Sequence, residues 1–340
     1  MNFIYILGAI LVFSVLIIIH ELGHFILAKL NGVKVEEFSI GMGPKILGIK
    51  GKETEYLIKA LPIGGYVKML GEEEKSLDER SFSSKSPGRR LSIIAAGPLM
   101  NFIFAILIFA IVGSIKGFFI PVVSKVDQNL PAYYSGIKEN DKIISINNKK
   151  IRNWEDFSSE MYMSKGESVN IGIERNNEIK IINVTPVKDE NQNKFVLGIY
   201  PTLLENPGIF KSLEYGVNQT ITIIKQVFGA FKSLFTGKAS ADDFGGPISI
   251  IRVSTKVAEA GIVPLITFAA FISVQLAIFN IIPFPALDGG WIFLLLFEII
   301  TRKKIDDNKV GVINYIGFVI LMALMIVVLI KDILHPINLN

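Results

Sequence analysis

The sequence predicts a polytopic α-helical membrane protein with four spans, the third broken at a Pro/Gly loop, and one small α/β domain outside the membrane. Half of the 340 residues are apolar and 19% are charged, whereas roughly a quarter of residues in soluble proteins are charged. Long apolar stretches alternate with ordinarily polar segments. The net charge of +4 is too small to indicate nucleic-acid binding, and without cysteine any metal must be held by histidines and carboxylates.

The apolar stretches have the lengths that membrane spans require. A first span covers residues 1–30, and its apolar run lacks the basic start and the cleavage site of a signal peptide. A second span covers residues 91–115 and a fourth covers residues 311–332. The stretch 262–300 is too long for one straight helix and is interrupted by prolines and glycines. We therefore expect it to form a broken third span.

Three segments between these spans differ in their patterns. Residues 31–90 contain short alternating runs with many glycines, followed by a charged stretch, which predicts a membrane-associated β-hairpin region and a loop. Residues 118–203 have the length and composition of one small soluble domain. Residues 206–260 contain apolar residues at helical spacing, which predicts amphipathic linker helices that could lie against the membrane surface.

The basic residues indicate the orientation of the chain. If residues 262–300 cross the membrane once, Arg89 and Arg90 lie on the same side as the basic run 302–304, as the positive-inside rule prefers. Two crossings would place these residues on opposite sides. A single crossing therefore predicts residues 31–90 on the cytoplasmic side and the small domain outside.

The end of the first span carries the motif His20-Glu21-Leu22-Gly23-His24. Positions i and i+4 of a helix project from one face, so two imidazoles can bind one zinc ion, with Glu21 placed to take a proton from the attacking water. The alternative is a helix that carries these residues without a function. Ionisable groups in an apolar span are costly and usually functional, and this favours a metal site.

A catalytic zinc commonly takes three protein ligands, so a third is required. Asp288 is a lone carboxylate within an apolar stretch, on the same predicted membrane side as His24. Its alternative role is the N-cap of the following helix. The nearby prolines break the helix, which a bilayer tolerates beside protein or a water cavity, and this favours a ligand. His335 follows the last span on the predicted outer side and is interpreted as an incidental interfacial residue.

Together these motifs are similar to those of the bacterial site-2 protease family. They are HELGH at 20–24, GGYV at 64–67, AGPLMNF at 96–102 and NIIPFPALDGG at 280–290, in the expected order over nearly the whole chain. The resemblance implies an intramembrane metalloendopeptidase whose Zn²⁺ is bound by His20, His24 and Asp288, with Glu21 as the catalytic base.

The same resemblance implies a substrate-binding site. Asn280, Pro283 and Pro285 would help to hold the substrate strand. Gly64 and Gly65 lie in a hairpin region that would present an edge to the unwound substrate. This fits a physical requirement, because a helical peptide hides its scissile bonds and must be extended before attack.

The outer segment resembles a single PDZ domain of the kind found in proteases. The likeness lies in residues 122–126, 129–137 and 140–147, although Asn140-Asp141 stands where Gly-Asp is usual and Asn147-Asn148 where Asn-Gly is usual. The alternative is another small β-rich domain. PDZ domains bind extended peptides or C-terminal tails by strand addition. Binding of a tail and exclusion of large substrates both remain open here. The segment GGPI at 245–248 also matches a family segment before the third span.

The resulting prediction is a multi-pass protein of the bacterial plasma membrane, with its PDZ domain extracytoplasmic and its active site near the cytoplasmic side. By resemblance, it cleaves pre-trimmed single-span proteins, such as anti-sigma factors and signal-peptide remnants, in regulated intramembrane proteolysis. A catalytically silent PDZ scaffold with a structural zinc is one alternative, but a pseudoenzyme usually loses its base or a ligand. A metal transporter is another, but it would need polar groups along a path across the bilayer.

Overall fold

The computed structural model describes residues 3–72, 76–189, 194–237 and 245–334. It divides into two compact units. Unit 1 comprises Met1–Ala105 and Val227–Asn340, and unit 2 comprises Ile106–Gln226. His335, interpreted above as an incidental residue, lies outside the described residues.

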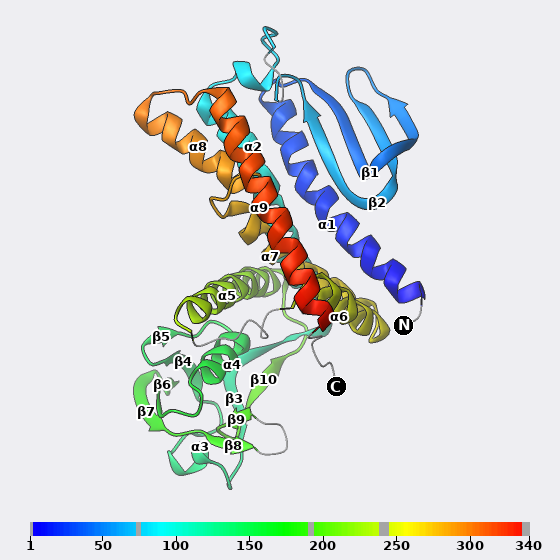
Figure 1. Ribbon diagram of the computed structural model, residues 1–340. Coiled ribbons are helices and arrows are strands. Elements are labelled where there is room, and N and C mark those ends of the chain that lie inside the picture. Colours follow the sequence, from blue (N-terminus) through cyan, green and yellow to red (C-terminus); the bar gives the residue numbers. More distant parts are fainter. Residues whose placement is uncertain (1–2, 73–75, 190–193, 238–244, 335–340) are drawn as a thin grey trace. The chain divides into compact units, whose positions relative to one another are not determined.

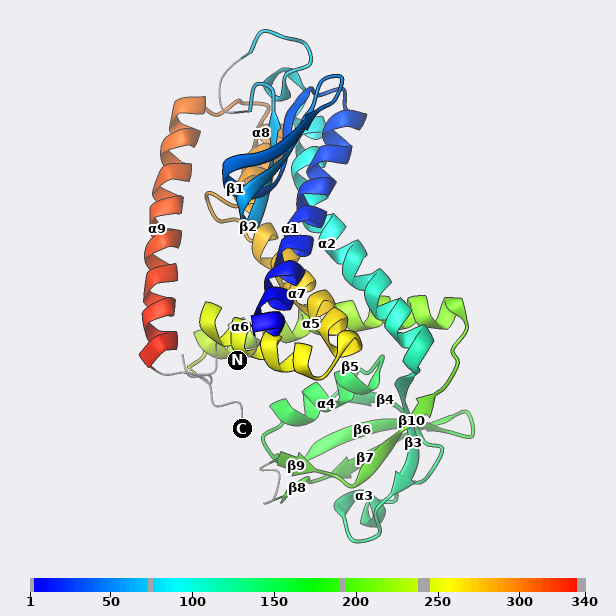
Figure 2. The ribbon, with the colours of Figure 1, turned by 90° about the vertical axis from the view of Figure 1, so that its right-hand side faces the viewer.

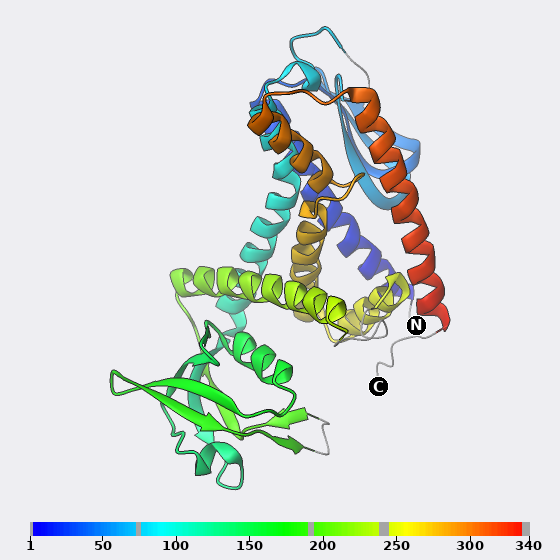
Figure 3. The same cartoon turned by 60° about the vertical axis from the view of Figure 1, so that its left-hand side comes forward.

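Four helices in the described part of the chain are long and apolar enough to cross a membrane. They are α1 (Phe3–Leu30), α2 (Pro87–Lys116), α7 (Ile262–Ile281) and α9 (Asp307–Leu334). The predicted broken third span consists of α7, an irregular segment 282–287, and the shorter helix α8 (Asp288–Thr301), as Figure 3 shows. Pro283 and Pro285 lie in the irregular segment, where a proline ring would obstruct a continuing helix.

A bent antiparallel sheet stands beside α1 in unit 1 (Figure 1), formed by β1 (Val35–Lys50) and β2 (Glu55–Met69). The first half of β1 is central, because Phe38 pairs with Val67 on one side and with Tyr56 on the other. Residues 65–69, at the end of β2, pair with β1 on one side, and the pairings of this sheet give them no strand on the other side. We call this segment the edge run. The turn after it leads through a short 3-10 helix, η1 (Phe82–Ser84), into α2.

Apolar packing fixes the end of α1 between this sheet and the helices. One cluster joins α1, the sheet, α2 and α8, and it contains Ala28, Val33, Val35, Phe38, Val67, Met69, Phe82, Ile93, Ile94 and Leu295. A second cluster joins Leu16 of α1 to Ala269 and Ile272 of α7. Close packing of these apolar side chains holds α1 against the sheet and against α7.

Helix α9 stands at the outer side of the unit 1 helices in Figure 2. Near its C-terminal end, Asp332 is almost completely buried and accepts a hydrogen bond from the backbone N–H of Ser249 at 2.7 Å. Ser249 belongs to the first turn of α6 (Pro247–Glu259). The carboxylate thus satisfies a backbone donor that a helix N-terminus leaves unpaired.

Unit 2 contains the small mixed domain. Its elements are β3 (Phe118–Val126), α3 (Pro131–Tyr134), β4 (Lys142–Ile146), β5 (Lys149–Lys150), α4 (Trp154–Met163), β6 (Val169–Arg175), β7 (Glu178–Val184), β8 (Val187–Asp189), β9 (Lys194–Val196) and β10 (Ile199–Leu204). The main sheet has the antiparallel order β10-β3-β4-β6-β7. Val123, Ile143, Ile171 and Ile173 are fully buried in its core. Helix α5 (Ile209–Phe235) follows this domain.

The turn between β4 and β5 contains Asn147-Asn148 in place of the Asn-Gly pair that is usual there. Asn147 and Asn148 have φ values of 47° and 65°. Both therefore adopt the left-handed conformation that two-residue hairpin turns require. Asparagine reaches this region more readily than most side chains, so the turn keeps its geometry without glycine.

Candidate metal centre

Three ligand-type side chains converge where α1 meets α8. His20 and His24 lie one turn apart on α1, and Asp288 is the first residue of α8. Oδ2 of Asp288 lies 3.0 Å from Nε2 of His20 and 3.5 Å from Nε2 of His24. The two Nε2 atoms are 3.2 Å apart. Both histidines are buried and Asp288 is half-buried.

This triangle has the size that a tetrahedral zinc requires. Two ligands at zinc distances of about 2.0–2.1 Å, separated by the tetrahedral angle, lie ~3.3 Å apart. Oδ2 of Asp288 is also buried, and it faces the Nε2 atoms of both imidazoles. A buried carboxylate that faces two nitrogen lone pairs is costly unless a proton or a cation lies between these atoms. The donor set of two imidazoles and one carboxylate suits zinc.

The outer nitrogens of the two imidazoles contact α2. Nδ1 of His24 lies 2.9 Å from the backbone carbonyl of Ile93. Because a carbonyl oxygen can only accept, Nδ1 carries the proton and Nε2 presents its lone pair towards Asp288. Nδ1 of His20 lies 3.3 Å from Nδ2 of Asn101. Asn101 belongs to the motif at residues 96–102, but the motif alone does not indicate this contact.

Two glycines make the close approach of α1 and α2 possible. A Cβ on Gly97 would lie 2.8 Å from Nε2 of His20 and would also collide with the ring of His24. A Cβ on Gly23 would lie 2.7 Å from the backbone carbonyl carbon of Ala96. Atoms at these separations cannot be accommodated without movement of the imidazoles or of the backbone. Gly97 therefore belongs to the site, although nothing in the local sequence pattern reveals which side chains it faces.

The segment before Asp288 is held in a tight loop. Gly290 lies where a Cβ would approach the carbonyl oxygen of Phe284 to 2.6 Å. Ala286 has φ of 73°, a left-handed conformation that costs a residue with a Cβ free energy. Leu287 is the N-cap of α8. Asp288 therefore does not have the N-cap role considered as its alternative, and its Oδ2 faces the histidines instead.

Glu21 lies between the histidines and the sheet. A Cβ on Gly65 would be 3.7 Å from Cγ of Glu21, within ordinary van der Waals contact. The backbone N–H of Val67 is directed at the Glu21 carboxylate. The edge run 65–69 thus begins next to a carboxylate that is itself one residue from His20. This arrangement can place a base beside an extended peptide.

The remaining residues predicted for substrate binding lie on two segments. Gly64 has φ of 90°, which glycine adopts without strain, and it turns β2 into the edge run. Asn280 is half-buried in the last turn of α7, Pro283 is exposed, and Pro285 packs against Gly317 of α9. These three residues therefore belong to the segment that leads directly to Asp288.

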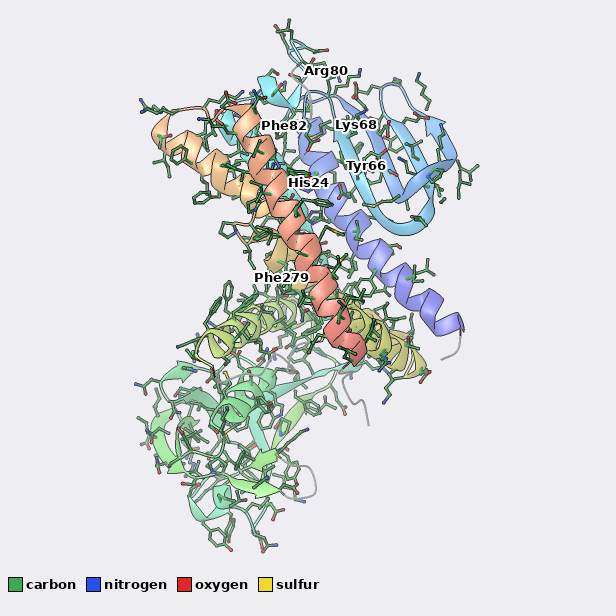
Figure 4. The ribbon with its side chains drawn as sticks, in the orientation of Figure 1. His24, Tyr66, Lys68, Arg80, Phe82 and Phe279 are labelled. Carbon is green, nitrogen blue, oxygen red and sulfur yellow. The ribbon has the colours of Figure 1, made fainter. Side chains whose placement is uncertain are left out.

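A cavity of about 870 Å³ opens beside the edge run. Its walls come from residues 66–70, from Trp291 of α8 and from Asn314 of α9. Figure 4 shows His24 on α1, with Tyr66 and Lys68 on the neighbouring strand. The Tyr66 hydroxyl accepts a hydrogen bond from Lys59 at 2.7 Å. Burial, together with the carboxylate of Glu37, raises the pKa of Tyr66, which therefore stays neutral at physiological pH.

Two kinds of sequence comparison with known proteins extend over almost the full length of the chain. The sequence pattern of peptidase family M50 matches residues 8–324. A Clostridium acetobutylicum protein that is named as a zinc metalloprotease is 54% identical, covering 99% of this chain and 100% of its own. The regulator of sigma-W protease RasP from Bacillus subtilis is 30% identical, covering 96% and 98%. A solved PDZ domain of a Listeria monocytogenes SdrC-like protein is 16% identical, covering 26% and 88%, with a TM-score of 0.22.

Proposed function

This chain belongs to peptidase family M50, the site-2 proteases, and on that premise we propose that it cleaves single-span proteins within or near their membrane span. The family resemblance predicted from the sequence is confirmed, and the protein is a zinc-dependent metalloendopeptidase of the membrane. The observation that carries the proposal is the convergence of His20, His24 and Asp288 beside Glu21 at the end of an apolar helix.

The geometry supports a proposed role for each residue of the site. His20, His24 and Asp288 would hold zinc, which when bound supplies Lewis acidity for the scissile carbonyl and for the attacking water. Glu21 takes a proton from that water and returns it to the leaving amine nitrogen. The Val67 N–H directed at Glu21 orients the carboxylate for this transfer. The surrounding apolar clusters limit access of bulk water.

The edge run supports a specific mode of substrate binding. Peptide groups along residues 65–69 that do not pair with β1 can form a ladder with an extended segment. Such a segment would pass Glu21 at Gly65 and continue along the cavity at residues 66–70. Asn280, Pro283 and Pro285 would hold it from the other side. Unwinding one segment of a substrate span would expose the peptide bond to be cleaved.

The substrates proposed are single-span proteins already trimmed outside the membrane, such as anti-sigma factors and signal-peptide remnants. RasP of Bacillus subtilis is named as a regulator of sigma-W, which supports a role in regulated intramembrane proteolysis. We assign the chain to a bacterial plasma membrane, with residues 118–203 as an extracytoplasmic PDZ domain. The active site would then lie near the cytoplasmic side, as the basic residues at 89–90 and 302–304 favour.

The test is cleavage of a tagged single-span substrate by wild type and by Glu21→Gln in membranes, with zinc content measured in both. Glu178→Gln is the matched control, because Glu178 is exposed in unit 2. We expect cleavage by wild type and the control, no cleavage by Glu21→Gln, and about one zinc in each protein. Cleavage by Glu21→Gln would contradict the assigned base. Zinc without cleavage in wild type, even on pre-trimmed substrates, would favour the silent scaffold.

A further inference from the structure

Asn101 is a buried amide in direct contact with the metal centre. It lies on α2, one turn after Gly97, and its side chain is completely inaccessible to solvent. Its Nδ2 is 3.3 Å from Nδ1 of His20. Its Oδ1 is buried and has no hydrogen-bond partner among the residues that the structure describes. The position of the residue is fixed from α7, because Ser273 donates a hydrogen bond from Oγ to the Asn101 backbone carbonyl at 2.9 Å.

This contact determines which nitrogen of His20 carries the proton. When Nδ2 of Asn101 donates to Nδ1, the neutral imidazole must carry its proton on Nε2. That proton then points towards Asp288, whose Oδ2 lies 3.0 Å away. A metal cannot bind a protonated Nε2. Zinc binding through Nε2 therefore requires the other tautomer, with the proton on Nδ1 and an acceptor beside it.

The same amide can supply that acceptor. A half-turn of the Asn101 amide about its last side-chain torsion exchanges Oδ1 and Nδ2, and places Oδ1 next to Nδ1 of His20. The oxygen that has no partner in one orientation then accepts a hydrogen bond in the other. His24 differs in this respect. Its Nδ1 faces the backbone carbonyl of Ile93, which cannot exchange donor for acceptor.

We propose that Asn101 is a positioning residue whose amide selects the tautomer of His20, donating to Nδ1 without metal and accepting from Nδ1 when Nε2 binds zinc. This inference rests on the proposed zinc centre. One ligand, His24, is set permanently by the backbone, and the other, His20, is set by a side chain that can turn.

Two substitutions at this position separate the tautomer role from simple packing. Asn101→Leu keeps a buried side chain of similar size but has no hydrogen-bonding group. Asn101→Asp keeps the shape and can only accept from Nδ1–H, as the zinc-bound arrangement requires. If Asn101 selects the tautomer, zinc affinity falls about 10- to 100-fold in Asn101→Leu and is retained or raised in Asn101→Asp. A packing role predicts the opposite order, because leucine suits an apolar interior and a carboxylate does not.

The experiment measures zinc affinity of the purified full chain by competition with a chromogenic chelator. Ser114→Ala is the control, since Ser114 is exposed on the same helix and its Oγ donates to the backbone carbonyl of Ile111; its zinc affinity should equal that of wild type. Retained affinity in Asn101→Leu, or a loss in Asn101→Asp as large as in Asn101→Leu, would overturn the inference. Failure of wild type to bind zinc would instead contradict the proposed function.

A second measurement covers the case in which Asn101→Leu does not fold. The rate of zinc loss into excess chelator is compared between wild type and Asn101→Asp. In wild type the amide can turn back and stabilise the metal-free tautomer, whereas the carboxylate cannot donate to Nδ1. We therefore expect slower zinc loss from Asn101→Asp. Faster loss would contradict the role assigned to the amide.

Discussion

Two aspartates, one in each unit, show how differently a carboxylate can be accommodated in this protein. Asp156 of α4 is 4% exposed, and its oxygens accept from Thr222 at 2.8 Å, from Lys225 at 3.1 Å and from the backbone N–H of Arg152 at 3.2 Å. Oδ2 of Asp288 is also buried, but it faces the two imidazole nitrogens at 3.0 Å and 3.5 Å. A buried charge surrounded by donors is structural, whereas one left facing two imidazoles indicates a site for a cation.

We expect the largest effect, on zinc content and on cleavage, from replacing Asp288 rather than Asp156. Asp288→Ala removes one of three ligands, so we expect zinc content near zero. The contribution of zinc to the transition state is several kcal/mol, and cleavage should fall by roughly 10³-fold or more. Zinc analysis and the membrane cleavage assay measure both quantities. Asp156→Ala should retain its zinc, and loss of zinc from that variant would break the comparison.

A pair of glycines on α2 tests how closely the metal centre is packed. Gly97→Ala introduces a Cβ that would lie 2.8 Å from Nε2 of His20, so we expect zinc affinity to fall by roughly 10- to 100-fold. Gly88 lies on the same helix, and a Cβ there would meet nothing within 4 Å. Gly88→Ala is therefore the matched control in chelator competition. Equal affinities in the two variants would show that the imidazoles can move freely.

The structural aspartate is expected to act on stability alone. Asp156→Ala removes hydrogen bonds to a charged group, each worth about 1.5–3 kcal/mol. Lys225 and Arg152 are partly exposed and can turn to water, so we expect a net loss of about 2 kcal/mol. Denaturant unfolding followed by Trp154 fluorescence, in a Trp291→Phe background, measures it. An unchanged midpoint would mean that the Asp156 contacts do not stabilise unit 2.

The smallest expected effect belongs to an accessible carboxylate. Hydrogen bonds from Arg80 and Lys29 lower the pKa of Glu53 to about 2. A carboxylate with a lowered pKa stabilises the folded state above its unfolded value of about 4.5, and this contribution is lost as pH falls towards about 2. Because Glu53 is 32% exposed, we expect its contribution to the free energy of unfolding to be less than about 1 kcal/mol. The unfolding free energies of wild type and Glu53→Gln, measured as the pH is lowered through this range, give this contribution. Parallel pH profiles of the two proteins would contradict the prediction.

The sequence was sufficient for the parts of the site that follow from local spacing. The i, i+4 pair of His20 and His24 predicts a shared helix face, and the structure places both Nε2 atoms 3.2 Å apart. Asp288 was predicted as the third ligand because a lone carboxylate is costly in an apolar stretch, and the structure places its Oδ2 within 3.5 Å of both Nε2 atoms; its role as a ligand remains a prediction. Zinc and the peptidase family are confirmed. The substrate roles of Asn280, Pro283, Pro285, Gly64 and Gly65 remain predictions.

The contacts between distant segments could not be read from the sequence. Asn101 lies 81 positions from His20, and no periodicity in α2 indicates that its amide faces an imidazole. Gly97 likewise could only be assigned once the crossing of α1 and α2 was known. The broken third span was expected, but the residues that α8 begins with, and the edge that β2 exposes, depend on tertiary packing.

The left-handed conformation of Ala286 places an unfavourable backbone geometry two residues before Asp288. Glycine at that position would remove the cost of φ at 73°, on the order of 1 kcal/mol, and would also allow the loop before Asp288 more conformations when unfolded. An alanine at this position restricts the loop to fewer backbone conformations than a glycine would. Laboratory selection for heat resistance and selection for faster turnover should therefore favour different residues at this one position.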